Sequence, residues 1–463
     1  MNLNININNM LKCFKRSIIL VLFVLLTQHL AGQEEKFFIQ DSEVFIQQIT
    51  TLLGETSNKS YLKQGGELMQ AFLPRWQAGR FSKSEKELIK EICEVLYAKK
   101  YRNYPYFFDF YKALNAFAGS SHNERSIVNW LLFTKLKLEN ESQRTFGDHL
   151  EYSNKLLISQ IISERGSYSW FLRNASYHFA SDTALILQVV KADLICASRR
   201  DSALILNTSG IFYASENLWK GQGGNTVWWR FEIDENDLKL HFSDYTVDLS
   251  QSEYSADSVT FSYGKYFNFS MLGRFEDKVF SSPPGNRTSY PRFYAYFNDY
   301  ELKQIFKSIT YRGGFMIEGA TIKGTGNGRR KAQLEFFQDD KLRMVLRSSE
   351  FVLTQKKIVS NTTAVLIPLG QDSLYHPAVH FQYDDQTRRL ILYRTEAGLA
   401  DSPFFDSFHK LDIHFESLYW MIDSSELHFR QLEGTRAESV GFLQSMNYFS
   451  FSDFDRLRLI DNQ

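Results

Sequence analysis

Arg165-Gly166-Ser167 separates two parts of the chain that differ in the spacing of their apolar residues. Before this stretch, apolar residues recur at intervals of three and four, which is typical of amphipathic helices. After it, apolar and polar residues alternate, and β-branched and aromatic residues become more frequent, which is typical of strands. The sequence therefore predicts an α+β multidomain protein, with an all-α domain over residues 33–165 and an all-β region over 166–463.

Six helices joined by short polar loops are predicted in the first part. Asp41 can cap the first helix, and Ser82-Lys83-Ser84-Glu85 has the pattern of a capping box, in which side chain and backbone bond reciprocally. A second helix over 61–73 is expected to stop at Pro74. The last is expected over 146–163. The short loops predict antiparallel helical hairpins.

The second part is predicted to be mainly antiparallel, because no long amphipathic helix separates its strands. Its many short strands suit a β-solenoid or a stacked sandwich. A division into two sub-domains is expected near residues 281–290, where Pro283-Pro284-Gly285-Asn286 marks a turn. The candidate strands are 185–190, 203–206, 226–231, 239–242, 258–263, 314–318, 332–337, 343–346, 364–367, 380–383, 389–393, 410–414 and 426–429.

Residues 1–32 have the layout of a secretory signal peptide. Lys12, Lys15 and Arg16 precede an apolar run over 18–26, and Leu30-Ala31-Gly32 supplies a small-residue cleavage site. The run is about nine residues long, whereas a membrane-spanning helix needs about 20. We therefore expect cleavage after Gly32 and no transmembrane segment in the cleaved chain.

Gln33 stands where a bacterial lipoprotein would carry the cysteine that receives the lipid. A glutamine has no thiol, so no thioether can form at this position. The cleaved protein is therefore expected to be periplasmic or secreted, without a lipid anchor.

The charge balance argues against nucleic-acid binding. The chain has 53 Lys and Arg residues and 53 Asp and Glu residues, and no basic excess that would attract phosphates. Two cysteines, Cys93 and Cys196, follow the leader. We favour two unpaired buried thiols, although a disulfide between them is also compatible with an exported protein.

Four three-residue motifs precede candidate strands, and each consists of an Asp, then a Ser or Thr, then an apolar residue. They match the short O-glycosylation acceptor pattern of exported proteins in the Bacteroidota, with the hydroxyls of Thr183, Ser202, Ser258 and Ser373 as acceptors. The alternative is turn chemistry, in which Asp and Ser side chains bond to nearby backbone. The two interpretations are compatible.

Tryptophan and histidine supply the remaining candidates. Trp219, Trp228 and Trp229 flank a glycine-rich turn and are candidates for stacking on a sugar ring, against the alternative of core packing. Trp228 and Trp229 are adjacent, so in a strand one of them should be exposed. Five histidines fall close together in sequence, but their spacing does not predict the convergence that a metal needs. They are His376, His380, His409, His414 and His428. We predict no metal site and no cofactor.

Several short motifs resemble those of large uncharacterised exported proteins of the Bacteroidota. They are Asp201-Ser202-Ala203-Leu204-Ile205, Trp219-Lys220-Gly221-Gln222-Gly223-Gly224, Val227-Trp228-Trp229-Arg230, Tyr290-Pro291-Arg292-Phe293, Tyr311-Arg312-Gly313-Gly314-Phe315 and Asp372-Ser373-Leu374-Tyr375-His376-Pro377. The resemblance covers most of the cleaved chain and implies an envelope location. Such proteins tend to be longer, which is compatible with a truncated or split product but does not decide it.

The sequence favours a structural or interaction protein of the cell envelope, binding a polysaccharide or a partner protein through its β surface. No residue stands out as catalytic, so an enzyme is not favoured. The alternatives are a carbohydrate-active enzyme on a β-helix or sandwich, and a lipid carrier with a β-groove. A cleft that gathers acidic side chains would favour the enzyme, and an apolar trough would favour the lipid carrier.

Overall fold

The computed structural model describes residues 37–39, 41–119, 124–231, 233–234, 236–281, 289–354, 356–395, 398–431 and 442–445. The predicted leader, and residues 282–288 of the predicted break, lie outside these ranges. The chain forms two compact units. One contains residues up to 159 together with 178–185, and the other contains 160–177 together with the residues from 186 onward.

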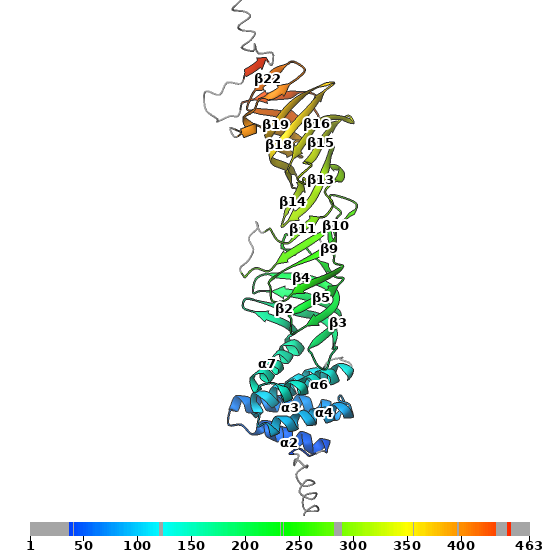
Figure 1. Ribbon diagram of the computed structural model, residues 1–463, viewed down its shortest axis with the longest axis vertical. Helices are drawn as coiled ribbons and strands as arrows, with labels where there is room; N and C mark the ends of the chain where they lie inside the picture. Colours follow the sequence, from blue (N-terminus) through cyan, green and yellow to red (C-terminus); the bar gives the residue numbers. More distant parts are fainter. Residues whose placement is uncertain are drawn as a thin grey trace, which may run out of the picture. The chain divides into compact units, whose positions relative to one another are not determined.

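The first unit is helical, as predicted (Figure 1). Its interior is aromatic: Phe45, Phe72, Phe110 and Trp130 are each 0% exposed. In the described part of this unit the α-helices are α2 (Ser42–Gly54), α3 (Lys59–Gln77), α4 (Lys83–Ala98), α5 (Phe108–Ala118), α6 (Glu124–Asn140) and α7 (Gln143–Asn154), and two short π-helical turns are η1 (Asn103–Phe107) and η2 (Lys155–Ser159).

The predicted helix caps are confirmed. The Asp41 carboxylate accepts from the backbone N–H groups of Glu43 and Val44. Ser82 and Glu85 form both bonds of the capping box. These contacts satisfy N–H groups that have no partner inside the helix.

Two helix ends differ from the prediction. Helix α3 continues through Pro74 to Gln77, because Phe72 and Trp76 lie on one buried face and Pro74 removes only one bond near the helix end. The helix expected over 146–163 ends at Asn154, and a strand begins at Ile161. Arg165-Gly166-Ser167 is accordingly the turn between the first two strands. Along the chain, the first unit gives way to the second between Ser159 and Gln160.

The second unit is a large antiparallel β region, as predicted (Figure 1). The strands among the described residues are β1 (Ile161–Arg165), β2 (Tyr168–Phe179), β3 (Ile186–Ala197), β4 (Ser202–Tyr213), β5 (Leu218–Gln222), β6 (Asn225–Thr226), β7 (Leu238–His241), β8 (Asp244–Asp248), β9 (Glu253–Tyr263), β10 (Ser270–Lys278), β11 (Arg292–Ala295), β12 (Tyr300–Phe306), β13 (Ile309–Glu318), β14 (Thr321–Thr325), β15 (Ala332–Gln338), β16 (Lys341–Ser348), β17 (Glu350–Leu353), β18 (Lys357–Leu369), β19 (Asp372–Asp384), β20 (Arg389–Tyr393), β21 (Phe404–Asp406), β22 (Leu411–His414), β23 (Ser417–Met421), β24 (Leu427–Arg430) and β25 (Phe442–Ser445).

The pairing divides the first part of this unit between two sheets. One sheet contains β1, β2, β3, β4, β5 and β8 in that order. The other begins where β4 also pairs with β6, and continues through β7, β9, β10 and β11 to β13. Strands β8 and β9 are consecutive in the chain but belong to different sheets.

Long strands change partners along their length. The first half of β13 pairs with β12 and β15, and its second half pairs with β11 and β14. Gly313 lies at this change with φ 157°, and a Cβ there would approach the Tyr311 hydroxyl to 2.4 Å. Only glycine fits this close approach without displacement.

Aromatic side chains fill the interior of the β unit. The rings of Phe261 and Phe293 stack with centroids 4.4 Å apart, and Phe315 packs against Phe261 at 5.5 Å. Burial of such side chains is the main source of stability for the unit, because each removes a large apolar area from water.

One predicted strand is wrong. Over 226–231 only Thr226 belongs to a strand, and Trp229–Phe231 forms a short 3-10 turn, η3. This turn points Arg230 toward buried carboxylates, which a continued strand would not do.

Candidate functional site

The three candidate tryptophans occupy different environments. Trp219 is 0% exposed, and its indole N–H donates to the Tyr245 hydroxyl at 3.2 Å. Trp228 is 1% exposed and donates to the Gly319 carbonyl. Trp229 is 43% exposed. Trp219 and Trp228 therefore pack in the core, and a stacking surface for a sugar rests on Trp229.

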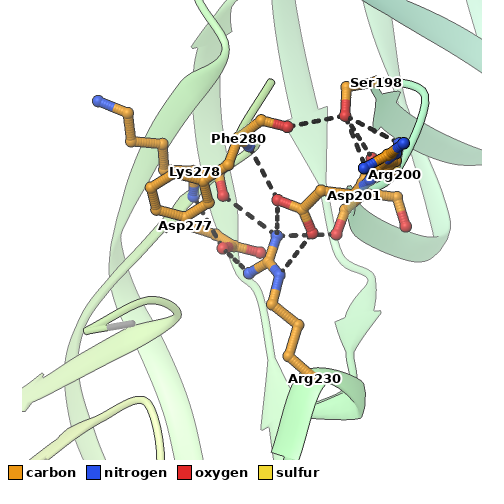
Figure 2. Close-up of polar contacts among 8 residues, drawn as sticks. Ser198, Arg200, Asp201, Arg230, Asp277, Lys278 and Phe280 are labelled. Atoms are coloured by element: carbon orange, nitrogen blue, oxygen red, sulfur yellow. Dashed lines mark hydrogen bonds and ion pairs between the residues drawn. The ribbon is translucent and has the colours of Figure 1, made fainter. Parts of the chain in front are cut away.

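Arg230 is buried between two carboxylates, as Figure 2 shows. Its side chain is 4% exposed. Its Nε lies 2.8 Å from Asp201 Oδ1, and its Nη1 lies 2.5 Å from Asp277 Oδ1. Asp201 precedes β4 and Asp277 lies near the end of β10, so one guanidinium links strands from both sheets. Such charge-assisted bonds are strong and directional.

Backbone groups complete this cluster. Arg230 Nη2 donates to the carbonyls of Ser202 and Lys278. The Phe280 N–H donates to Asp201 Oδ2 at 2.8 Å, and the Lys278 N–H donates to Asp277 Oδ1 at 2.7 Å. Each buried charge is thus met by hydrogen bonds, which offsets the cost of removing it from water.

Burial raises the pKa of Asp277 to about 6, although Arg230 lowers it in part. Burial also raises the pKa of the Cys196 thiol, and the nearby carboxylate of Asp277 raises it further. Cys196 is therefore a protonated core thiol. Cys93 and Cys196 are both unpaired and buried in the described structure, as predicted.

A pocket of about 350 Å³ lies over β8, β9 and β10. This volume is in the range of small-ligand sites. Asp277 reaches the pocket wall from the ion cluster, and the other lining residues are mostly polar or charged. They are Thr246, Val247, Asp248, Gln251, Glu253, Tyr254, Ser255, Arg274, Glu276 and Tyr290.

The acidic side chains of the pocket are largely held by cations. Glu276 lies 3.0 Å from Arg274, and Glu253 lies 2.9 Å from Lys278. With Asp277 bound to Arg230, three of the four acidic side chains have a basic partner. The fourth, Asp248, accepts from the Ser250 N–H at 2.9 Å.

Tyr254 is the buried polar group of the pocket that lacks a partner. It is 6% exposed, and among the described residues its hydroxyl has no hydrogen-bond partner. Burial, and then the charge of Asp277, raise the pKa of this hydroxyl, so it keeps its proton. The hydroxyl oxygen itself is inaccessible to water, so it faces the core and not the open pocket, and an unpartnered buried donor of this kind costs free energy.

The four acceptor candidates for O-glycosylation also differ in environment. Thr183 and Ser258 are exposed, whereas Ser202 and Ser373 are half-buried. The Asp201 side chain of one triplet is 0% exposed and bound to Arg230. Ser258 has φ 59°, and its N–H donates to the Tyr296 hydroxyl, which in turn donates to the Asp257 carboxylate. The Asp side chains of these two triplets therefore bind residues that are distant in the chain, Arg230 and Tyr296.

The histidines serve local contacts. His376 is fully buried, its Nε2 lies 2.8 Å from the Ser402 carbonyl, and burial lowers its pKa to about 4. His409 Nδ1 lies 2.7 Å from Asp406. No group of three or more His, Cys, Asp or Glu side chains in the described ranges could hold a metal ion.

Comparison with protein-family models, curated proteins and solved structures finds no match for this chain. Its function is therefore argued from the site alone. Arg230, Asp277 and Tyr254 were not singled out from the sequence. One sequence feature could have identified Asp277: it is a charged residue at a position of β10 where the alternation places buried side chains.

Proposed function

We propose that this protein is an exported interaction protein of the cell envelope, which binds a partner protein or a polymer through its β unit. The pocket over β8, β9 and β10 carries this proposal, because it combines mostly polar lining residues with the edges of two strands, β8 and β9, that do not pair with each other. Among the described residues, no helix is long and apolar enough to cross a membrane.

The strand partners support a stacked arrangement for the β unit. Strands such as β13 pair with different neighbours in their two halves, and the aromatic residues lie inside. We infer that layers of antiparallel strands stack along this unit, in a sandwich-like or solenoid-like manner.

A carbohydrate-active enzyme is the second candidate, because the pocket gathers four acidic side chains and the pKa of Asp277 is raised to about 6. A glycosidase needs one carboxyl as acid and another as base or nucleophile. Here Glu253, Glu276 and Asp277 each pair with a basic side chain, which favours binding over hydrolysis. A lipid carrier would need an apolar trough, whereas this pocket has polar walls.

An assay for new reducing ends separates the two candidates. Incubation of the purified protein with envelope polysaccharides should release none, and the Glu276→Gln variant should behave identically. Release of reducing ends that is abolished by Glu276→Gln would establish the enzyme and contradict the binding proposal. Binding is measured by co-sedimentation of the protein with an isolated envelope fraction. We expect the protein to be found in the pellet with that fraction.

Intact mass of the protein recovered from outside the cytoplasm tests export and modification together. We expect a chain that begins at Gln33, because the small residues before it form the cleavage site. Additional mass that maps to the exposed Thr183 or Ser258 would support O-glycosylation. A chain that retains residues 1–32 and stays in the cytoplasm would contradict export.

A further inference from the structure

Strands β8 and β9 face one another with unpaired edges. Across the described residues, β8 pairs only with β5, and residues 253–256 of β9 pair only with β10. We call the gap between residues 244–248 and 253–257 the seam. The pocket lies along it, since Thr246 and Asp248 line one side and Glu253 and Ser255 line the other.

The register shows which backbone groups of β8 face the seam. The Leu249 N–H donates to the Asn217 carbonyl, and the Gly223 N–H donates to the Ser243 carbonyl. In an antiparallel pair, alternate residues point their N–H and C=O groups toward the partner. Thr246 and Asp248 therefore point theirs away from β5, into the seam.

The same argument applies to β9. The Val279 N–H donates to the Ser252 carbonyl, so Tyr254 exchanges bonds with its opposite residue, Asp277. Glu253 and Ser255 then point their N–H and C=O groups away from β10, toward β8. Both walls of the seam thus present backbone donors and acceptors.

Both ends of the seam are held in place. At one end, the turn between the strands is fixed to the first sheet: Tyr168 donates to the Ser250 carbonyl and Trp170 donates to the Gln251 carbonyl. At the other end, the Ser243 hydroxyl donates to the Ser258 carbonyl at 3.2 Å. The open length is therefore that of a few residues, at about 3.3 Å per extended residue.

We propose that the seam binds a short extended peptide segment that carries a basic side chain. This rests on the proposed function and names the ligand class of the same pocket. Unpaired strand edges are complemented by another peptide backbone, as in β-strand addition. Of the four acidic side chains that line the pocket, Asp248 has no basic partner among the described residues. Its negative charge favours a lysine or arginine on the ligand.

The test is a titration of the full chain with a fluorescein-labelled heptapeptide of alternating threonine and lysine. We expect saturable binding, and at least tenfold weaker binding when alternate amides of the peptide are N-methylated. The N-methylated peptide keeps the charge but loses backbone donors. Equal binding of the two peptides would show charge attraction alone and would overturn the proposal, as would absence of binding to both.

Variants locate the binding. Asp248→Asn removes a negative charge from the pocket wall and should weaken binding of the lysine peptide by roughly fivefold, whereas Tyr254→Phe removes a hydroxyl that is inaccessible from the pocket and should change binding less than twofold. Ser255→Pro removes an N–H that faces the seam and no bond to β10, so it should weaken binding by about tenfold, whereas Ser255→Ala keeps the N–H and should change binding less than twofold. If the proline variant does not fold, Asp248→Asn remains decisive. Binding that none of these variants changes would place the peptide elsewhere.

A saccharide arm distinguishes the failure of this inference from the failure of the proposed function. A neutral oligosaccharide mixture should not compete with the peptide. Competition by the saccharides would show a sugar site, and would overturn the peptide proposal while leaving a binding function in place. Loss of both peptide binding and envelope co-sedimentation would contradict the proposed function itself.

Discussion

The Arg230→Met variant is expected to lower the free energy of unfolding by about 3–5 kcal/mol. Methionine keeps much of the side-chain volume but leaves Asp201 and Asp277 without their cation, and both carboxylates are nearly inaccessible to water. An uncompensated buried charge is among the largest single costs a substitution can introduce. Guanidinium unfolding followed by circular dichroism at the β-sheet band measures the loss.

The pH dependence of this loss identifies its cause. The pKa of Asp277 in the folded protein is about 6, above its ordinary value of 3.8, so the folded state holds a proton that the unfolded state has released. Stability from this group is thus greatest below about pH 4 and declines as the pH rises through about 6. Without Arg230 the pKa of Asp277 rises further, so the decline should continue to higher pH, and in Asp277→Asn the contribution of this group should disappear.

A matched control is the ion pair of Arg388 and Asp423, where the aspartate side chain is 66% exposed. Arg388→Met should cost less than about 1 kcal/mol, because water screens that pair. A loss for Arg230→Met no larger than this control would mean that the buried cluster does not hold the two sheets together.

The Trp219→Ala variant is expected to cost about 3–5 kcal/mol, as is usual for a fully buried aromatic side chain. Trp219 is 0% exposed, and its removal also leaves the Tyr245 hydroxyl without one of its two hydrogen bonds. Thermal or guanidinium unfolding of the purified variant provides the measurement.

Trp229→Ala is the matched control for this prediction. Trp229 is 43% exposed and contacts the Arg230 guanidinium, with 5.5 Å between that group and the ring centroid. Its removal should cost about 1 kcal/mol or less. Equal costs for the two variants would contradict the assignment of one tryptophan to the core and the other to the surface.

Strand locations followed from alternation where alternation was regular. The strand expected over 389–393 coincides with β20, whose residues alternate between exposed or half-buried and buried. The strand expected over 203–206 is only the start of β4, which continues to Tyr213. Asn207 interrupts the pattern with φ 54°, and its N–H is held by the Asp193 carboxylate. Such a bend depends on a neighbouring strand, which periodicity does not reveal.

The residues of the candidate site could not be predicted from the sequence in the same way. Asp201, Arg230 and Asp277 are widely separated in the chain, so no local spacing marks their cluster. The seam contradicts a local rule as well, because two strands joined by a short turn usually pair as a hairpin. Here β8 pairs with β5 instead, and contacts from Tyr168 and Trp170 hold the turn.

Site-resolved amide hydrogen exchange of the free protein tests the open seam most directly, because it needs no ligand. The N–H groups of Thr246, Glu253 and Ser255 should exchange fast, while those of Val247 and Tyr254, which face paired strands, should be protected. Addition of the lysine-containing peptide should then protect the first group. Equal protection of both groups in the free protein would show that β8 and β9 pair with each other, and would contradict a binding site between them.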